Sequence, residues 1–446
     1  MSLINFINNA SANAVRSGLI EIKNNYLPNS EFLPNTNPLK LNTDDAIKNH
    51  FNRTTLINPD DAKAYLAASA LLHCFDGWNY LSSSIENLLK GDNAISIHLA
   101  YYAELRATSS FLATEGIGVF NYKHFCISSS SAIIGNPSLR PNNDRYPTHT
   151  FVWDALDAWI KNTAKPSDAL KYFSFSGKTF EEWINHIPIA NTIATAPLFL
   201  RDWLKDWSFD INRFKDDRSD RNIFSYRPSV NRDFNLADLS LKLNQLNNFW
   251  KALEPSTSNR FSLLDKYLFK ILINKIHSIL VQSGSRYTIN QFIDDTFTNA
   301  RLSIDISLKQ IIINDIKHSL IENAKDSTID SSGYPKPFSI IARAILMLRL
   351  SSGATAFMLK HARISKAELD FYWNVVGVEY GFWHPSNPPA NFTELWSQIN
   401  DSILDLEDWL SNFSPDINLK SLHDINLDNQ ACYTQFNRAS FWGTGF

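Results

Sequence analysis

The sequence predicts an all-α fold with minimal β structure, built as a helical bundle followed by a second helical domain. Apolar residues recur at the three- and four-residue spacing of amphipathic helices along most of the chain. Only residues 287–292 (YTINQF) and 132–134 (AII) suggest short edge strands. At 446 residues, the chain also exceeds the size at which one hydrophobic core usually stops growing.

The N-terminal part of the chain is expected to form an extension and then a first long helix. Residues 1–60 are rich in Asn, Pro and Ser around one helix-like patch at 14–26, so we expect them to wrap around the body of the protein. Pro59 and the two carboxylates that follow it suit the first turn of a helix. The apolar stripe of this helix is Leu71, Phe75, Trp78, Leu81, Ile85 and Leu88.

A second long helix follows after the short polar turn at residues 91–93. Its stripe is Ile95, Leu99, Tyr102, Leu105 and Leu112, and Gly116 and Gly118 supply a backbone that commonly ends a helix. Because the connection is so short, the two helices should pack as an antiparallel pair.

Beyond this pair, the pattern predicts a long loop or short hairpin at 121–147 and a new helix from Thr148. The charged segment 213–229 has balanced charge and contains a proline, and we place a domain boundary there. The expected organisation is an extension (1–60), a helical domain (61–229) and a C-terminal helical domain (230–446). Helical patterns in the last part cover 236–253, 263–281, 304–323, 338–362, 367–382 and 392–413.

The most apolar of these patterns is interrupted by Arg343, Arg349 and Gly353. A membrane-spanning helix tolerates such charges poorly. We therefore expect a buried helix there, followed by a second one.

Composition bounds the location and the partners of the protein. The formal charge of -3 and the pI of about 6.4 lack the basic excess of an autonomous nucleic-acid-binding protein. Three widely spaced cysteines, with no basic and apolar leader, favour a reducing cytoplasm. Contact with nucleic acid is then expected locally or through a protein partner.

The second helix of the pair reads HLAYYAELRATSSFLATEGI and resembles the core helix of the HEPN superfamily, helical-bundle proteins of prokaryotic toxin and antiviral systems. The matching positions are His98, Tyr101, Tyr102, Ala103, Leu112 and Gly116. In the most similar subgroup a Thr-His pair opens the next helix, and Thr148 and His149 would fill that place if 121–147 is an insertion. The resemblance covers about residues 64–160 and implies a four-helix bundle and a role in defence.

Ribonuclease members of that superfamily use an Arg and a His on one helix, the Arg to hold phosphate charge and the His to move a proton. No Arg precedes a His at the family spacing in this sequence. The candidates that remain are Arg106, which would have to meet His149 across the bundle, and Arg145, which is separated from His149 by a proline. The competing interpretation is structural: His149 would bind backbone at a helix start, and Arg106 would pair with Glu104, Glu115 or a carbonyl.

Tryptophan is the other distinctive residue type. Trp203 and Trp207 share a helix face and are flanked by cations, while Trp383 lies in the loop-like segment GFWHPSNPP. Such aromatics can anchor a partner or stack on bases, and they can equally fill gaps between helices.

No phosphate-binding glycine loop and no pair of histidines one helical turn apart occurs in the sequence, so we expect neither a cofactor nor a metal site. The favoured hypothesis is a non-enzymatic helical accessory subunit of a prokaryotic antiviral or anti-plasmid complex, holding or regulating a separate nuclease or ATPase. The alternative is a divergent, metal-independent HEPN ribonuclease that acts on single-stranded RNA through Arg106 or Arg145 with His149.

Overall fold

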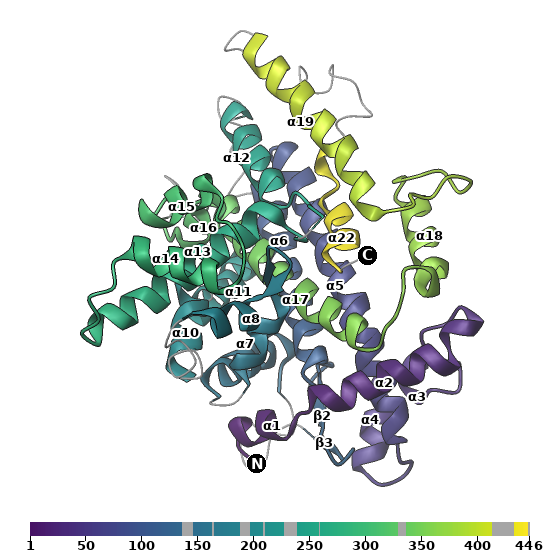
Figure 1. Ribbon diagram of the computed structural model, residues 1–446. Helices are drawn as coiled ribbons and strands as arrows, with labels where there is room; N and C mark the ends of the chain where they lie inside the picture. Colours follow the sequence, from purple (N-terminus) through teal and green to yellow (C-terminus); the bar gives the residue numbers. More distant parts are fainter. Residues whose placement is uncertain are drawn as a thin grey trace.

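The computed structural model confirms the all-α fold (Figure 1). It describes residues 1–135, 146–162, 165–187, 197–207, 210–226, 239–257, 259–328, 336–412 and 432–444.

The N-terminal half contains α1 (Leu3–Asn9), α2 (Ala12–Asn25), η1 (Leu27–Asn29), α3 (Pro38–Leu41), α4 (Thr43–Phe51), α5 (Pro59–Leu89), α6 (Asn93–Thr114), β1 (Ile117–Gly118), β2 (Phe125–Ile127), β3 (Ile133–Gly135), α7 (Thr148–Lys161), η2 (Pro166–Tyr172), β4 (Ser174–Phe175), β5 (Lys178–Thr179), α8 (Phe180–His186), α10 (Pro197–Asp206) and α11 (Ile211–Tyr226). The C-terminal half contains α12 (Leu239–Ala252), α13 (Ser262–Gln282), α14 (Ile289–Asn299), α15 (Ile306–Ile313), α16 (Ser319–Lys325), α17 (Pro337–His361), η5 (Ala367–Leu369), α18 (Asp370–Glu379), η6 (Phe392–Glu394), α19 (Leu395–Asn412), η7 (Phe436–Arg438) and α22 (Ala439–Gly443).

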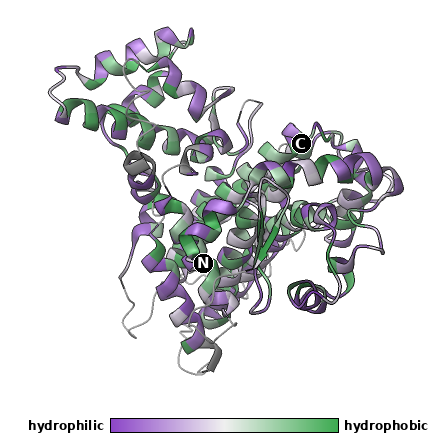
Figure 2. Ribbon diagram, turned by 90° about the horizontal axis from the view of Figure 1, so that it is seen from below, coloured by the Kyte–Doolittle hydropathy of each residue, from purple (hydrophilic) through white to green (hydrophobic). Residues whose placement is uncertain are grey.

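Helices α5 and α6 form the expected antiparallel pair, and α17 packs against both of them at the centre of the molecule (Figure 1). At Gly77 of α5, an added Cβ atom would lie 2.8 Å from Leu348 of α17 and 3.3 Å from the carbonyl oxygen of Ala103 in α6. The three helices therefore approach each other closely through small residues. Hydrophobic residues concentrate in this interior, and hydrophilic ones colour the outer helix faces (Figure 2).

Helix α17 runs without a break through Gly353, so the expectation of two helices in this segment was wrong. A Cβ atom at Gly353 would lie 2.3 Å from the carbonyl oxygen of Tyr172. The glycine serves close packing inside the helix and does not end it. Among the described helices, only α17 is long and apolar enough to cross a membrane, and 94% of its apolar window is buried inside the protein.

Packing contacts join the described residues on the two sides of the expected boundary at 213–229. Residues 211–226 form α11, which packs on α6 and α7, and α17 from the later half lies against α5 and α6. The C-terminal segment also returns to α5, where the backbone N–H of Asn437 donates to the hydroxyl of Ser82 at 2.7 Å. The buried apolar residues of both halves form one continuous cluster.

Strand structure is limited to two small antiparallel sheets in the described residues. Strands β1, β2 and β3 form one of them, with β2 in the middle, so the edge expected at residues 132–134 is confirmed in β3. The edge expected at 287–292 is wrong, because Thr288 and Gln291 form a capping box that begins helix α14. The pattern at 304–323 is likewise divided between α15 and α16.

Candidate functional site

The tyrosine-bearing face of α6 meets the start of α7 and one face of α11. Helix α7 begins at Thr148, as the sequence predicts, and this places His149 in its first turn. The Tyr101 hydroxyl lies 3.0 Å from Nδ1 of His149 and accepts a hydrogen bond from the indole of Trp153 at 3.4 Å. Tyr101 and His149 stack with ring centroids 5.8 Å apart. The face of α6 that carries Tyr101 is therefore in direct contact with the first turn of α7.

Two guanidinium groups from α11 reach the same place. Nη2 of Arg221 lies 3.5 Å from Nε2 of His149, and the Arg221 guanidinium stands over the rings of Tyr101 and Tyr102 at 5.3 and 5.6 Å. Arg218 donates to the hydroxyl of Thr150 at 2.8 Å and to the carbonyl of His149 at 3.4 Å. The side chains of His149, Arg218 and Arg221 are all partly exposed, so this cluster reaches the surface.

The contacts of His149 fix which of its nitrogens can accept a proton. A guanidinium only donates, so a hydrogen bond from Arg221 requires a lone pair on Nε2. The ring proton then resides on Nδ1 and is donated to the Tyr101 hydroxyl oxygen. Burial, and next the positive charges of Arg221 and Arg218, lower the pKa of His149 to about 4. The ring is consequently neutral at physiological pH, with its basic nitrogen turned toward a cation.

A second histidine and a second tyrosine extend the aromatic part of the cluster. The rings of His98 and Tyr102 lie 5.0 Å apart, and Tyr80 of α5 stacks on Tyr102 at 5.5 Å. Burial and the charge of Arg221 also lower the pKa of His98. The result is a partly exposed patch that combines neutral imidazoles, tyrosine rings and two guanidinium groups.

The arginines expected to act with His149 are not the ones found there. Nη1 of Arg106 lies 3.1 Å from Nδ1 of His73 on α5, so Arg106 joins a different contact. Arg145 lies outside the described residues. The guanidinium groups that lie beside His149 belong to Arg218 and Arg221 of α11, which the sequence analysis did not single out.

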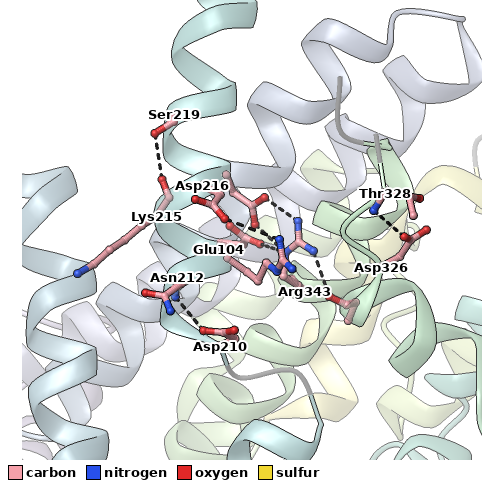
Figure 3. A network of polar contacts seen from close by, with 12 residues as sticks. Glu104, Asp210, Asn212, Lys215, Asp216, Ser219, Asp326, Thr328 and Arg343 are labelled. Carbon is pink, nitrogen blue, oxygen red and sulfur yellow. Dashed lines mark hydrogen bonds and ion pairs between the residues drawn. The ribbon is translucent and has the colours of Figure 1, made fainter. Parts of the chain in front are cut away.

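A buried ion-pair network joins α11 to α6 and α17 (Figure 3). Arg343 of α17 binds Asp217 of α11 through two hydrogen bonds, Nε to Oδ2 at 2.7 Å and Nη2 to Oδ1 at 2.6 Å. Glu104 of α6 lies 3.9 Å from Nε of Arg343. Because Asp217 and Arg221 are one helical turn apart, the ion pair anchors the same face of α11 that carries Arg221.

Sequence reasoning missed Arg218, Arg221 and Asp217 because it took their segment for a boundary. A segment of balanced charge such as 213–229 can form two kinds of structure that the sequence does not distinguish. It can be a solvated connection, or it can be a helix with one face buried against acidic and basic partners. Asp217 and Arg221 at helical spacing, with Phe214 on the same side, are the signal that could have indicated the helix.

The tryptophans expected to bind partners are distributed differently. Trp203 in α10 and Trp207 directly after it are fully buried and pack edge-on against Phe173 at 5.5 and 5.4 Å, as in the gap-filling interpretation. Trp383 is half-buried and stacks on Phe392 with centroids 5.9 Å apart. Of the three, only Trp383 keeps an exposed part that a partner could contact.

In the described ranges, no group of three or more His, Cys, Asp and Glu side chains is placed to hold a metal ion. The three cysteines are buried thiols. The chemistry available at the α6–α7–α11 junction is that of cations which can hold a phosphate and a neutral imidazole which can accept a proton.

Fold and site together define an all-α protein with a partly exposed arginine–histidine–tyrosine cluster at the junction of three helices. Comparison with family models, with curated proteins and with solved structures finds no match to this chain. The HEPN resemblance rests on the residues quoted above.

Proposed function

We propose that the His149–Arg221 cluster binds single-stranded RNA and cleaves it without a metal ion, in the cytoplasm of a prokaryote. The observation that carries this proposal is the convergence of a neutral imidazole and a guanidinium at a partly exposed position, with Nη2 and Nε2 3.5 Å apart. The HEPN resemblance, in which an Arg and a His share this work, supports it.

The residues can divide the reaction between them. When the Arg221 guanidinium leaves Nε2 of His149 and binds the phosphate, the RNA 2′-hydroxyl attacks the adjacent phosphorus and the freed Nε2 takes the hydroxyl proton. The bond from phosphorus to the 5′-oxygen breaks, the leaving 5′-oxygen takes a proton from water, and a 2′,3′-cyclic phosphate remains. Arg221 stabilises the charge that develops on the phosphate oxygens, and the Tyr102 ring offers a surface on which a base can stack.

The test is cleavage of an end-labelled single-stranded RNA by the purified full-length chain in EDTA, with analysis of the product ends. We expect 5′-hydroxyl and 2′,3′-cyclic phosphate products. His149→Gln and Arg221→Gln should each lower the rate by about a hundredfold or more, the usual cost of losing a general base or a charge-stabilising donor. Arg286→Gln, an exposed arginine between α13 and α14, is the matched control. Cleavage that is absent, or equal in all variants, would refute the proposal.

A second function is favoured by a separate observation. Arg218 is used internally, because its guanidinium ties α11 to Thr150 and to the His149 carbonyl. These contacts hold α7 against α11 and give the cluster a structural role. Such a role is expected in a non-enzymatic accessory subunit that holds a separate nuclease or ATPase of a defence complex. Affinity purification from the native host should then recover such a partner equally with wild-type protein and with His149→Ala. A solitary chain that cleaves RNA would exclude this second function.

A further inference from the structure

A pocket of about 950 Å³ lies far along the chain from the α6–α7–α11 cluster. Its walls come from the end of η2, the β4–β5 hairpin and the start of α8, residues 255–257, 259 and 260, the C-terminal end of α17, and residues in or next to η6, α19 and α22. Pockets of this size accommodate small organic ligands and cofactors. The lining residues that matter for its chemistry are Tyr172, Arg260, Phe357, Lys360, Asn391 and Trp396.

The lining carries more positive than negative charge. Lys171, Arg260 and Lys360 are lining cations, and Glu182 is the one carboxylate among the described lining residues. Glu182 already accepts hydrogen bonds from the backbone N–H and the hydroxyl of Thr179, at 2.6 and 2.9 Å, as part of a capping box. The acidic partners of Lys171 lie outside the lining. Because Lys171 pairs with Asp168 and Glu181, and the charge of Lys360 acts on Glu182, the excess positive charge that an anion would meet comes from Arg260.

Arg260 is the centre of this excess. Its charge interacts with the carboxylate of Asp265 and with the guanidinium of Arg349. The nearby carboxylate of Asp265 is bound by Arg349, with Nε and Oδ1 2.7 Å apart. Burial, and next the repulsion of Arg349, lower the pKa of Arg260 to about 10, so the group is still charged at neutral pH. Two guanidinium groups thus face one carboxylate, and of these three groups only Arg260 lines the pocket.

The walls also offer flat apolar surfaces. Trp396 and Phe357 are both partly exposed at the pocket. Trp442 stands edge-on to Trp396 with centroids 6.4 Å apart. The indole N–H of Trp442 donates a hydrogen bond to the Leu253 carbonyl, which fixes the orientation of the Trp442 ring. Planar heteroaromatic rings stack on such side chains, and a base is the commonest planar group that also carries phosphate.

We propose that this pocket binds a free nucleotide, with a phosphate on the Arg260 guanidinium and the base against Trp396. Lys360 at the rim contributes charge to a second phosphate. The assignment is independent of RNA cleavage at His149 and concerns a different part of the surface.

Isothermal titration calorimetry of the full-length protein with ADP tests the proposal, with adenosine, inorganic phosphate and a 5′-phosphorylated dinucleotide titrated separately. ADP should bind, and adenosine and phosphate alone should bind at least tenfold more weakly. Arg260→Gln should weaken ADP binding at least tenfold, and Arg286→Gln should leave it unchanged. Trp396→Leu, as an independent variant, should weaken ADP binding while leaving the phosphate titration unaltered.

Three results would overturn the assignment. One is the absence of ADP binding at millimolar concentration, and another is equal affinity for ADP and adenosine. The third is a dinucleotide that binds tenfold more tightly than ADP with the same dependence on Arg260, because this would assign the pocket to the end of a nucleic-acid strand. Circular dichroism of each variant confirms that a lost signal reflects the pocket and not unfolding.

Discussion

Helix α17 carries two buried arginines, Arg343 and Arg349, and the excess charge around them is acidic in one case and basic in the other. Around Arg343, one guanidinium faces two carboxylates, those of Asp217 and Glu104. Around Arg349, one carboxylate, that of Asp265, faces two guanidinium groups, because Arg260 also interacts with it. Acidic groups are therefore in excess around Arg343, and basic groups are in excess around Arg349, which lies about two turns later in the same helix.

The two charge imbalances can be neutralised in different ways. A carboxyl group can take a proton, and burial together with the neighbouring Asp217 raises the pKa of Glu104 well above its usual range. Glu104 is then neutral, and the region around Arg343 is balanced without any ligand. A guanidinium keeps its proton at any physiological pH, so the surplus around Arg349 can be removed only by an anion from outside. This difference suggests that the first region is structural and the second is a binding site.

The largest effect on the free energy of unfolding is expected when the carboxylate of Asp265, which faces Arg349 and Arg260, is removed. Asp265→Asn leaves Arg349 buried with no counter-charge, which typically costs about 3–5 kcal/mol. Urea denaturation at pH 7 should show this loss, while Asp44→Asn at an exposed position in α4 should change the free energy of unfolding by less than about 1 kcal/mol. Equal, small losses in both variants would mean that Arg349 has another partner.

A smaller effect is expected at the second carboxylate of the acidic region. Glu104→Gln preserves the shape of a neutral carboxyl, so it should change the free energy of unfolding by less than about 1 kcal/mol at pH 7. Because the folded-state pKa of Glu104 is raised, wild-type stability should fall as the pH rises from the unfolded value near 4.5 toward the folded one. The Gln variant should lack that part of the slope between pH 5 and 8. A variant that is destabilised by several kcal/mol, with the slope intact, would show that Glu104 is ionised in the folded protein.

The smallest effect is expected at Arg260 in the absence of a ligand. Arg260→Gln removes a cation that is repelled by Arg349, so the apo protein should be unchanged or more stable by up to about 1 kcal/mol. Thermal melting with and without ADP measures this, and the wild type should gain more from the nucleotide than the variant does. A clear loss of stability in the apo variant would indicate a structural role for the Arg260 side chain.

The sequence predicts correctly those features of the fold that depend on local residue patterns. The α5–α6 pair and the start of α7 at Thr148 follow from apolar spacing and from proline and glycine positions. The contact of Tyr101 with His149 was not predicted, because it joins two helices whose relative placement no local pattern sets. What the sequence did not reveal depends on pairing between distant residues. Nothing near Asp217 indicates that its partner is Arg343, and nothing near Gly353 indicates that the backbone of Tyr172 lies against it.

The central claim is that His149 acts as a neutral base beside Arg221, and the pH dependence of RNA cleavage tests it most directly. With a His149 pKa of about 4, the active, unprotonated form predominates above that value. The account predicts that kcat/KM in EDTA stays level from about pH 5.5 to 7.5, falls as the pH drops through about 4, and loses this acid limb in His149→Gln. An acid limb centred near 6.5, or one that persists in His149→Gln, would contradict the account.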